Sequence, residues 1–400
     1  MSTSDPAPGS TASLRTANQR RVLDVLRGQG PVVAPTDGPA EGQITQAELA
    51  RTTGLAPATV SSIVRELAGA GLVATVKGSG RRGTTVQLAS SAGVVAGIDF
   101  GHRHVSVAVG DLTGQVVCEA SRPLGPAHHY DEGLGHAAEM LASMLTDLAL
   151  EADAVRTVGL GLPAPIIDDV VRSSAILPGW VGVNAKRVAM ERFAGPVHIE
   201  NDANLGALAE HRLGSARGHS TMIYLKLSSG VGSGIVIDDR LFHGASGTAG
   251  EVGHLTVDEH GPVCRCGSRG CLETYASTGS VLELMATHMP DATLDDVVEA
   301  ARGGNVSAVR SLEDAGLHLG WGLGSLVNLF NPSLIVIGGD LARAGDLLLD
   351  SARVGLRRHA LDAVAATPVV VSELGRRAAL VGSVLLAAER TDLLPEAASG

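Results

Sequence analysis

A cluster of cysteines in the second half of the chain constrains its structure most strongly. Cys264, Cys266 and Cys271 lie within eight residues, and His254 stands ten residues before the first of them. Three thiolates and one imidazole suit a closed tetrahedral zinc site, because zinc prefers sulfur and nitrogen ligands. Glycines inside the cluster allow the tight turns that would aim three sulfurs at one point. The sequence therefore predicts a structural zinc ion without an open coordination position. The alternative is a set of reduced thiols that bind no metal.

The first ninety residues predict three helices. Apolar residues recur at helical spacing over residues 14–27, 45–53 and 58–70. Thr45, followed three residues later by a glutamate, has the sequence of a capping box, and Gly54 provides a helix stop. The short break after Gly54 makes the second and third helices a helix-turn-helix pair.

Two strands and a basic hairpin follow this pair. Residues 72–76 and 84–88 alternate in polarity, and residues 77–83 between them hold three cations at a glycine-rich tip. This order predicts a winged helix-turn-helix domain, with its second helix in the major groove of DNA and its wing against phosphates. A helical module for dimerisation or protein docking is the alternative. The residues expected to contact DNA are Ala58, Thr59, Ser61, Ser62, Arg65, Arg81 and Arg82.

The charge distribution supports a division into residues 1–90 and 91–400. The first part holds 9 Lys and Arg against 6 Asp and Glu, whereas the second holds 22 against 36. A weakly basic segment on an acidic body is typical of a nucleic-acid-binding module attached to another domain. Aromatic residues are scarce, at 4 Phe, 3 Tyr and 2 Trp, which disfavours stacking platforms for single strands. We therefore expect double-stranded operator DNA as the partner.

No segment predicts export or membrane insertion. Residues 1–19 contain no apolar run of the kind found in signal peptides. The longest stretch without a charged residue, 315–339, contains six glycines and a proline, which favours helix, turn and strand over a membrane span. We expect a cytoplasmic protein that does not contact membranes.

The remaining residues predict a duplicated α/β fold. An apolar strand at 94–98 leads through Asp99 into a turn and a second strand at 105–109. Roughly 130 residues later, strands at 223–227 and 235–237 flank a glycine-rich turn. The repetition predicts two lobes with a cleft between them, and backbone N–H groups of such turns bind phosphates in many proteins. Two purely structural hairpins would give the same pattern.

Carboxylates and amides are placed where a cleft of this kind binds ligands. Asn201 and Asp202 follow an apolar strand and open a helix, and ligands of α/β folds bind at the carboxyl ends of strands. Glu251 and Glu273 flank the cysteine cluster. Carboxylates accept hydrogen bonds from hydroxyls and amides also donate, so the set suits a polyhydroxylated ligand. The alternative is that Asn201 and Asp202 only cap the helix.

These motifs resemble those of the ROK family of repressors, open reading frames and sugar kinases, in its transcription-factor branch. The resemblance covers nearly the whole chain. It rests on residues 97–101, 159–165, 177–180, 200–204, 244–254 and 331–339 and on the cysteine cluster. It implies a two-lobed, actin-like ATPase fold behind the winged helix.

The resemblance also implies roles for individual residues. The zinc ligands of the family match His254, Cys264, Cys266 and Cys271, and the sugar-contacting positions match Asn201, Asp202, Glu251, His254 and Glu273. Asp202 stands at the position of the catalytic base of the kinases.

Both presumed phosphate loops depart from the kinase pattern. Family kinases carry Thr, often followed by Lys, where this chain has His102 and Arg103, and Gly-Thr-Gly where it has residues 228–230, Ser-Ser-Gly. The expected function is therefore a DNA-binding regulator without catalytic residues, a repressor of sugar uptake or catabolism genes that a monosaccharide or derivative releases. The alternatives are an ATP-dependent sugar kinase with Asp202 as base and an appended DNA-binding domain, or a regulator controlled by a protein partner. A homodimer or homotetramer is expected, because helix-turn-helix proteins read paired half-sites.

Overall fold

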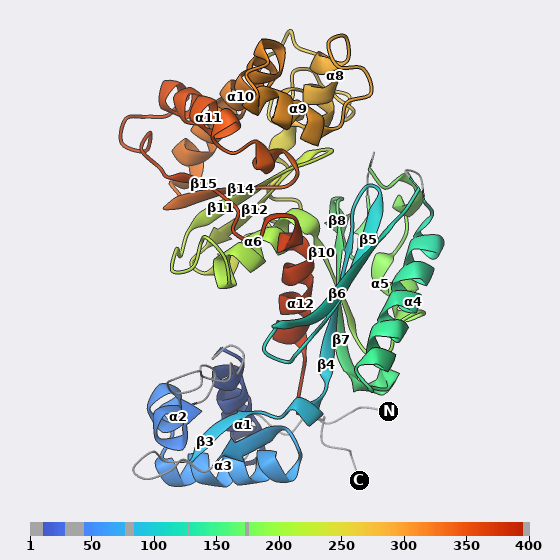
Figure 1. Ribbon diagram of the computed structural model, residues 1–400. Helices are drawn as coiled ribbons and strands as arrows, with labels where there is room; N and C mark the ends of the chain where they lie inside the picture. Colours follow the sequence, from blue (N-terminus) through green and yellow to red (C-terminus); the bar gives the residue numbers. More distant parts are fainter. Residues whose placement is uncertain (1–10, 29–43, 77–83, 126–127, 173–175, 395–400) are drawn as a thin grey trace.

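The computed structural model describes residues 11–28, 44–76, 84–125, 128–172 and 176–394. They form an N-terminal module and two α/β lobes, with the module and the second lobe at opposite ends of the molecule (Figure 1). In this part of the chain, no helix combines the length and the apolar character that a membrane crossing requires.

The N-terminal module is a winged helix-turn-helix. Its elements are α1 (Thr11–Arg27), β1 (Ile44–Thr45), α2 (Gln46–Thr53), α3 (Pro57–Gly69), β2 (Val73–Val76) and β3 (Thr85–Leu88), with the strands paired in the order β1-β3-β2. The predicted capping box is confirmed, because the Thr45 side chain accepts from the Glu48 N–H and the Glu48 carboxylate accepts from the Thr45 N–H. Gly54 ends α2 in the left-handed conformation, with φ of 68°. The strands begin one residue later than predicted.

The first lobe is built on a sheet with the strand order β10-β7-β4-β5-β6. Strands β4, β7 and β10 run parallel, whereas β5 and β6 are antiparallel to their neighbours. The strands are β4 (Val94–Phe100), β5 (His104–Gly110), β6 (Val116–Pro123), β7 (Val155–Leu162) and β10 (Val197–Asn201), with a small hairpin of β8 (Ile166–Ile167) and β9 (Val170–Val171). Helices α4 (Tyr130–Asp147) and α5 (Ala185–Met190) cover one face of the sheet (Figure 1).

The second lobe repeats this arrangement. Its sheet has the order β15-β14-β11-β12-β13, in which each strand takes the place of its counterpart in the first lobe. The strands are β11 (Met222–Leu227), β12 (Val231–Ile237), β13 (Arg240–Leu241), β14 (Leu334–Gly338) and β15 (Val369–Val371). The helices are α6 (Asp202–Arg212), α7 (Glu273–Ala276), α8 (Thr278–Met285), α9 (Leu294–Arg302), α10 (Val306–Phe330) and α11 (Asp346–His359). The predicted duplicated α/β fold is therefore confirmed.

One expected turn is shorter than the sequence predicted. The glycine-rich turn between residues 227 and 235 is reduced to residues 228–230, because β12 already begins at Val231. Gly234 belongs to this strand, and a Cβ at that position would lie 2.6 Å from the Ala203 carbonyl oxygen and 2.9 Å from the Asn204 Cα. Glycine is therefore needed there for α6 to approach the strand, not for a phosphate-binding turn.

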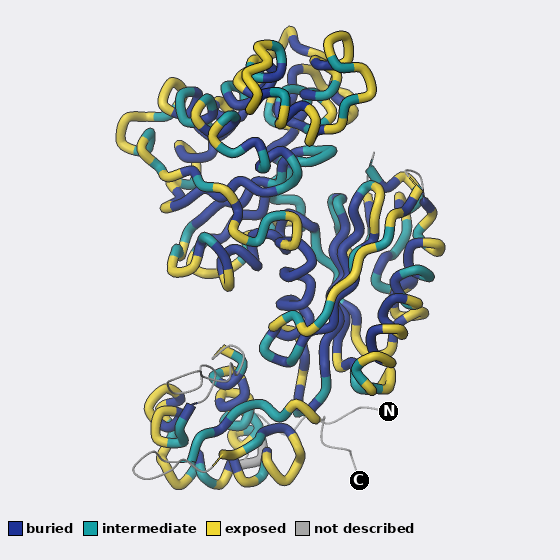
Figure 2. Tube along the Cα trace, viewed as in Figure 1, coloured by how far each residue is buried: buried dark blue, intermediate teal, exposed yellow. Residues whose placement is uncertain are grey.

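Helix α12 (Ala378–Arg390) connects all three parts of the molecule. It packs against α6 and against β4 and β7 of the first lobe. Its residues 378–388 are buried, and Figure 2 shows this buried stretch between the lobes. Gly97 in β4 makes this contact close, because a Cβ there would lie 2.8 Å from the backbone nitrogen of Val384. A Cβ at Gly159 in β7 would overlap the Ser383 carbonyl oxygen.

The N-terminal module shares an apolar core with the first lobe and α12. Val22 and Leu23 of α1 belong to the same buried cluster as Val95 of β4 and Val384 of α12. Leu393, just beyond α12, completes the cluster. The module is therefore packed onto the body and not only joined to it through the chain.

We expect Gly159→Ala to lower the free energy of unfolding by about 1–3 kcal/mol, because overpacking forces neighbouring backbone to shift. Gly135→Ala in α4 is the matched control, since a Cβ there meets no atom within 4 Å and alanine favours a helix interior by about 0.5–1 kcal/mol. Urea unfolding followed by circular dichroism measures both. Equal stability of the two variants would contradict the close contact between β7 and α12.

Candidate functional site

A cleft of about 1250 Å³ lies between the two lobes. The residues at the ends of β4 and β10 line one side, the residues after β11 and β14 line the other, and the start of α12 closes its floor. The five predicted sugar-binding residues, which the sequence scatters over more than 70 positions, all line this cleft. They are Asn201, Asp202, Glu251, His254 and Glu273.

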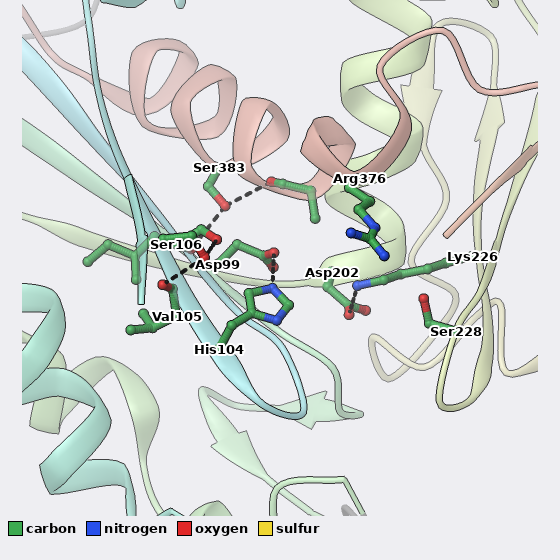
Figure 3. Close-up of polar contacts among 12 residues, drawn as sticks. Asp99, His104, Val105, Ser106, Asp202, Lys226, Ser228, Arg376 and Ser383 are labelled. Atoms are coloured by element: carbon green, nitrogen blue, oxygen red, sulfur yellow. Dashed lines mark hydrogen bonds and ion pairs between the residues drawn. The ribbon is translucent and has the colours of Figure 1, made fainter. Parts of the chain in front are cut away.

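Asn201 and Asp202 differ in what their side chains do. The Asn201 Oδ1 accepts hydrogen bonds from the N–H groups of Ala203 (2.8 Å) and Asn204 (3.3 Å), so this residue is the N-cap of α6. Asn201 therefore caps the helix, as the alternative predicted, but it also lines the cleft. For Asp202 it is wrong, because its Oδ2 lies 2.6 Å from the Nζ of Lys226 on β11 (Figure 3).

Glu273 ties the cysteine loop to the second presumed phosphate loop. Its Oε1 accepts from the Nε of Arg265 at 2.6 Å, and its Oε2 accepts from the Val231 N–H at 3.0 Å. The same guanidinium donates through Nη2 to the Ser229 carbonyl oxygen at 2.7 Å. Glu273 is buried, so it orients this side of the cleft as well as lining it.

Glu251 and Asp99 are cleft carboxylates in poorly hydrated surroundings. Burial raises the pKa of Glu251, although His254 opposes the effect. Burial also raises the pKa of Asp99 against the influence of Lys226. The Oδ1 of Asp99 is buried without a hydrogen-bond partner, and its Oδ2 lies 4.0 Å from the Nε2 of His104 (Figure 3).

The cysteine cluster gathers its four predicted ligands. One ligand atom from each of His254, Cys264, Cys266 and Cys271 lies within 4.8 Å of all the others. The Sγ atoms of Cys266 and Cys271 are 3.7 Å apart, and these cysteines are free thiols. Gly267 takes a φ of 93° where the loop reverses direction. Four sulfur and nitrogen donors around one point, without a disulfide, form a set that could hold a metal ion.

The presumed phosphate loop after β11 is already hydrogen-bonded within the protein. The Oγ of Ser228 donates to the Oδ2 of Asp340 at 3.0 Å, and the Asp340 N–H donates back to this Oγ at 3.1 Å. The Nε of Arg376 donates to the Oδ1 of Asp340 at 3.0 Å. Through Asp340, these hydrogen bonds therefore hold the loop after β11 against Arg376, which precedes α12.

A histidine–glutamate pair links β10 to the loop after β13. The Nε2 of His243 lies 2.8 Å from the Oε2 of Glu200, whose Oε1 accepts from the Asn204 Nδ2 at 2.9 Å. Burial opposes the ionisation of Glu200, but the hydrogen bonds from His243, Asn204 and the Asn201 N–H outweigh it and lower its pKa. The hydrogen bond to Glu200 raises the pKa of His243.

Sequence reasoning missed Lys226, Arg265, Glu200 and His243. Lys226 carried a usable signal, because it is the sole charged residue in the otherwise apolar strand β11. Glu200 directly precedes the pair Asn201 and Asp202, which also pointed to it. Nothing in the local sequence indicates that His243 reaches Glu200, 43 residues before it, or that Arg265 reaches Glu273, eight residues after it.

The predicted DNA-contacting residues divide into two groups. Arg81 and Arg82 of the wing lie outside the described residues. On α3, Ala58, Ser62 and Arg65 are exposed, whereas Thr59 and Ser61 are half-buried. The Ser61 Oγ donates to the Oε1 of Gln46 at 2.9 Å, and the Ser62 Oγ donates to Glu66 at 3.0 Å. The Ser61 hydroxyl thus helps to fix α3 against α2, the Ser62 hydrogen bond lies within α3, and Arg65 is exposed.

Comparison with known proteins gives matches over most of the chain. The sequence matches the ROK family over residues 95–390 and the MarR family over residues 15–82. It is 32% identical to the xylose repressor of Bacillus spizizenii over 322 residues, which cover 78% of this chain and 82% of that protein. A ROK family transcriptional regulator described as a homologue of the Escherichia coli MLC protein superposes with a TM-score of 0.75 at 24% identity, over 92% of this chain and 96% of that one. A ROK family glucokinase from Streptomyces griseus, in complex with glucose and AMPPNP, gives a TM-score of 0.65 at 29% identity over 74% of this chain and all of that one.

The pair of His243 and Glu200 predicts a pH-dependent contribution to stability. Because the pKa of His243 is raised, the folded protein binds this proton more tightly than the unfolded chain does. The pair therefore stabilises the fold fully at pH values below the ordinary histidine pKa of 6.5, and this stabilisation is lost as the pH rises through the raised pKa. The lowered pKa of Glu200 adds stability above its ordinary value of 4.5 that is lost as the pH falls. We expect His243→Gln to lower the melting temperature more at about pH 6 than at about pH 8.5. His288→Gln, at an exposed histidine, is the control, and an equal effect of His243→Gln at both pH values would contradict the ion pair.

Proposed function

The chain belongs to the ROK family, and we propose that it is a DNA-binding transcriptional repressor whose cleft binds a monosaccharide or a close derivative that releases it from operator DNA. One observation carries the proposal: a helix-turn-helix module and a cleft lined by carboxylates and amides are packed on the two ends of one buried helix, α12. The similarity to a repressor named for xylose supports a sugar as the effector.

The cleft suits a neutral, hydroxyl-rich ligand. Asp202 and Glu251 provide carboxylate oxygens, each of which has lone pairs beyond those already used within the protein. Asn201, Glu273 and His254 complete the proposed contacts from the cap of α6 and the two sides of the cysteine loop. Because Asn201 and Glu273 are fixed by hydrogen bonds to backbone and Asp202 by its bond to Lys226, these side chains lose little freedom when a ligand binds.

Operator DNA would be read by α3. Arg65 is exposed and suited to a guanine or a phosphate, and the small side chains of Ala58, Thr59, Ser61 and Ser62 permit close approach to the groove. Arg81 and Arg82 would add phosphate contacts from the wing. Two such modules in a homodimer or homotetramer would read paired half-sites.

Helix α12 provides the route from the cleft to DNA. At its cleft end, Arg377 forms a bidentate pair with Glu119 of β6, with both N–O distances at 2.7 Å. At its other end, the Arg27 guanidinium of α1 donates to the Thr391 carbonyl oxygen, and the Thr391 hydroxyl donates to Thr157 of β7 at 2.9 Å. A change in cleft width would therefore move the base on which the DNA-binding module rests.

The cysteine cluster would hold a structural zinc ion. His254, Cys264, Cys266 and Cys271 supply all four ligands of a tetrahedral site, so the ion contributes rigidity and no open coordination position. It would fix the loop that carries His254 and Arg265 against Glu273 at the edge of the cleft. Loss of the ion would therefore disturb the sugar contacts on this side.

An ATP-dependent sugar kinase is the second candidate, because the Streptomyces griseus glucokinase shares the fold of the lobes. Three features favour the repressor: the lysine on Asp202, the internally bonded loop at Ser228, and the N-terminal module. A coupled assay of ADP release with glucose, xylose and N-acetylglucosamine separates the two. We expect rates at background, whereas sugar-dependent turnover would favour the kinase.

We expect Asp202→Asn to give a repressor that binds operator DNA normally but responds to sugar only at much higher concentrations. Replacing a charged acceptor costs about 1.5–3 kcal/mol per hydrogen bond, comparable with a typical allosteric coupling of about 1–3 kcal/mol. The measurement is fluorescence anisotropy with duplex DNA selected from a random library, titrated at fixed salt with and without sugar. Asp350→Asn, at an exposed carboxylate on α11, is the control. Release of the Asp202→Asn variant at the wild-type sugar concentration would contradict a sensing role for this residue.

For the metal, we expect one zinc ion per chain in protein purified without chelators, and its loss in Cys271→Ser. Removal of one thiolate from a four-ligand site leaves the ion poorly held and frees the loop. Elemental analysis measures the metal, and Cys118→Ser, at a half-buried thiol on β6 outside the cluster, serves as the control. Wild-type protein without zinc would contradict the assignment.

A further inference from the structure

Lys226 is an unusual residue for this chain. Lysine occurs at only three positions, Lys77, Lys186 and Lys226, whereas the remaining 28 of the 31 basic residues are arginines. Lys226 lies near the end of β11 between Leu225 and Leu227, which belong to the apolar core of the second lobe. A strand that buries a charged side chain needs a specific partner for it.

The partner of Lys226 is Asp202, and both are largely withdrawn from water. The Nζ to Oδ2 distance is 2.6 Å, and the exposed fractions of the side chains are 22% for Lys226 and 7% for Asp202. Asp202 opens α6, so this ion pair joins the central strand of the second lobe to a helix that packs between the lobes.

A second carboxylate acts on the same ammonium group. Asp99 comes from β4 of the first lobe, is 4% exposed, and interacts electrostatically with both Lys226 and Asp202. Figure 3 shows Lys226 extended toward Asp202, with Asp99 and His104 on the far side of that carboxylate. Two carboxylates at one poorly hydrated place repel each other, and the ammonium group offsets that repulsion.

Three of the other cations around the cleft, which Arg103 also lines, are paired with carboxylates other than Asp202. Arg265 is bound to Glu273, and Arg376 to Asp340. Arg377 is bound to Glu119, on the edge strand of the first lobe. Among the described residues, Lys226 is therefore the cation placed to compensate Asp202, with His104 beside Asp99 at 4.0 Å.

We propose that Lys226 is the resident counter-cation of the effector site, which holds Asp202 as an ionised hydrogen-bond acceptor so that the sugar binds without a nucleotide or a divalent cation. The proposal rests on the proposed function, since it assigns a positioning residue to that site. The ammonium group of Lys226 has three N–H donors and uses one of them for the Oδ2 of Asp202. The other oxygen of this carboxylate, Oδ1, is left to accept a hydrogen bond from a sugar hydroxyl. Transfer of a hydroxyl proton to Asp202 would leave the ammonium facing a neutral carboxyl group. The pair therefore favours binding of the hydroxyl over its deprotonation.

The first test needs no effector. With only three lysines, ¹⁵N labelling of the side-chain nitrogen gives few ammonium signals, and Lys226→Arg identifies one by removing it. We expect the Lys226 ammonium protons to exchange with water at least tenfold more slowly than those of Lys186, which lies 3.8 Å from the half-buried Asp169 and is 40% exposed. Asp202→Asn should abolish this protection. Equal exchange of the two lysines, or protection that survives Asp202→Asn, overturns the proposal.

The second test measures the affinity for sugar in buffer without nucleotide or magnesium. The probe is whichever of D-xylose, D-glucose and N-acetyl-D-glucosamine raises the melting temperature of the wild type, since a ligand of the native state stabilises it. By calorimetric titration we expect Lys226→Met to weaken binding at least tenfold and Lys226→Arg to restore most of it. Lys186→Met, the matched control, should bind like the wild type.

A double variant separates a role through Asp202 from a general structural role. If Lys226 acts by holding Asp202, then Lys226→Met with Asp202→Asn should bind no more weakly than Asp202→Asn alone. Three results each overturn the proposal. The first is a double variant whose loss of sugar affinity is the product of the two single losses, and the second is a Lys226→Met variant that binds sugar like the wild type. The third is a tenfold gain in the affinity of the wild type for sugar when magnesium and AMPPNP are added. A wild type that binds none of the sugars contradicts the proposed function instead, and the exchange experiment still decides the role of Lys226.

Discussion

The rest of the structure depends on the close contact between α12 and the strands of the first lobe. Gly97 and Gly159 lack side chains where the helix crosses β4 and β7, and a Cβ at Gly382 would meet the backbone of Leu205 in α6. Backbone therefore packs against backbone, which leaves little room for gradual deformation. Because α6 and α12 lie between the lobes, the two sheets are expected to move as rigid bodies around this helix pair.

Most of the charged side chains that line the cleft form ion pairs with one another. Each of its ion pairs joins different elements, so the pairs fix the position of loops as well as neutralise them. The pairs are Asp202 with Lys226, Glu273 with Arg265, Asp340 with Arg376, and Glu119 with Arg377. Cations that are committed in this way offer little to the phosphates of a nucleotide, whereas carboxylate lone pairs and fixed amides remain suitable for hydroxyls. The internal pairing thus supports the proposed role of the cleft in binding a sugar.

Features set by neighbouring residues could be predicted from the sequence. The capping box at Thr45 and the left-handed stop at Gly54 depend on contacts within a few residues, and the cysteine cluster depends on contacts within residues 254–271. The duplicated sheet followed from the repeated strand and turn patterns. The Asn201 position allowed two interpretations, cap and cleft residue, and both describe it.

Features that depend on tertiary distance could not be predicted. Glu200 and His243 are 43 residues apart, and Arg20 of α1 pairs with Asp392, which is 372 residues away. The shared core of α1 and α12 likewise joins the two ends of the chain. Such contacts have no local signal, because they are specified only when the whole sheet order is in place.

This shared core decides how a small change in the cleft could act on DNA. A module on a flexible linker would keep its freedom whatever the lobes did, but one with a common apolar core must follow α12. In a dimer that reads half-sites about 34 Å apart, a modest rotation of each rigid body changes the spacing of the recognition helices. A sugar that favours one cleft width needs only a differential affinity of about 1–3 kcal/mol to shift such an equilibrium. In the proposed repressor, the rigidity of the contacts around α12, and not the strength of any one of them, is therefore what would carry a small difference in sugar affinity to the DNA.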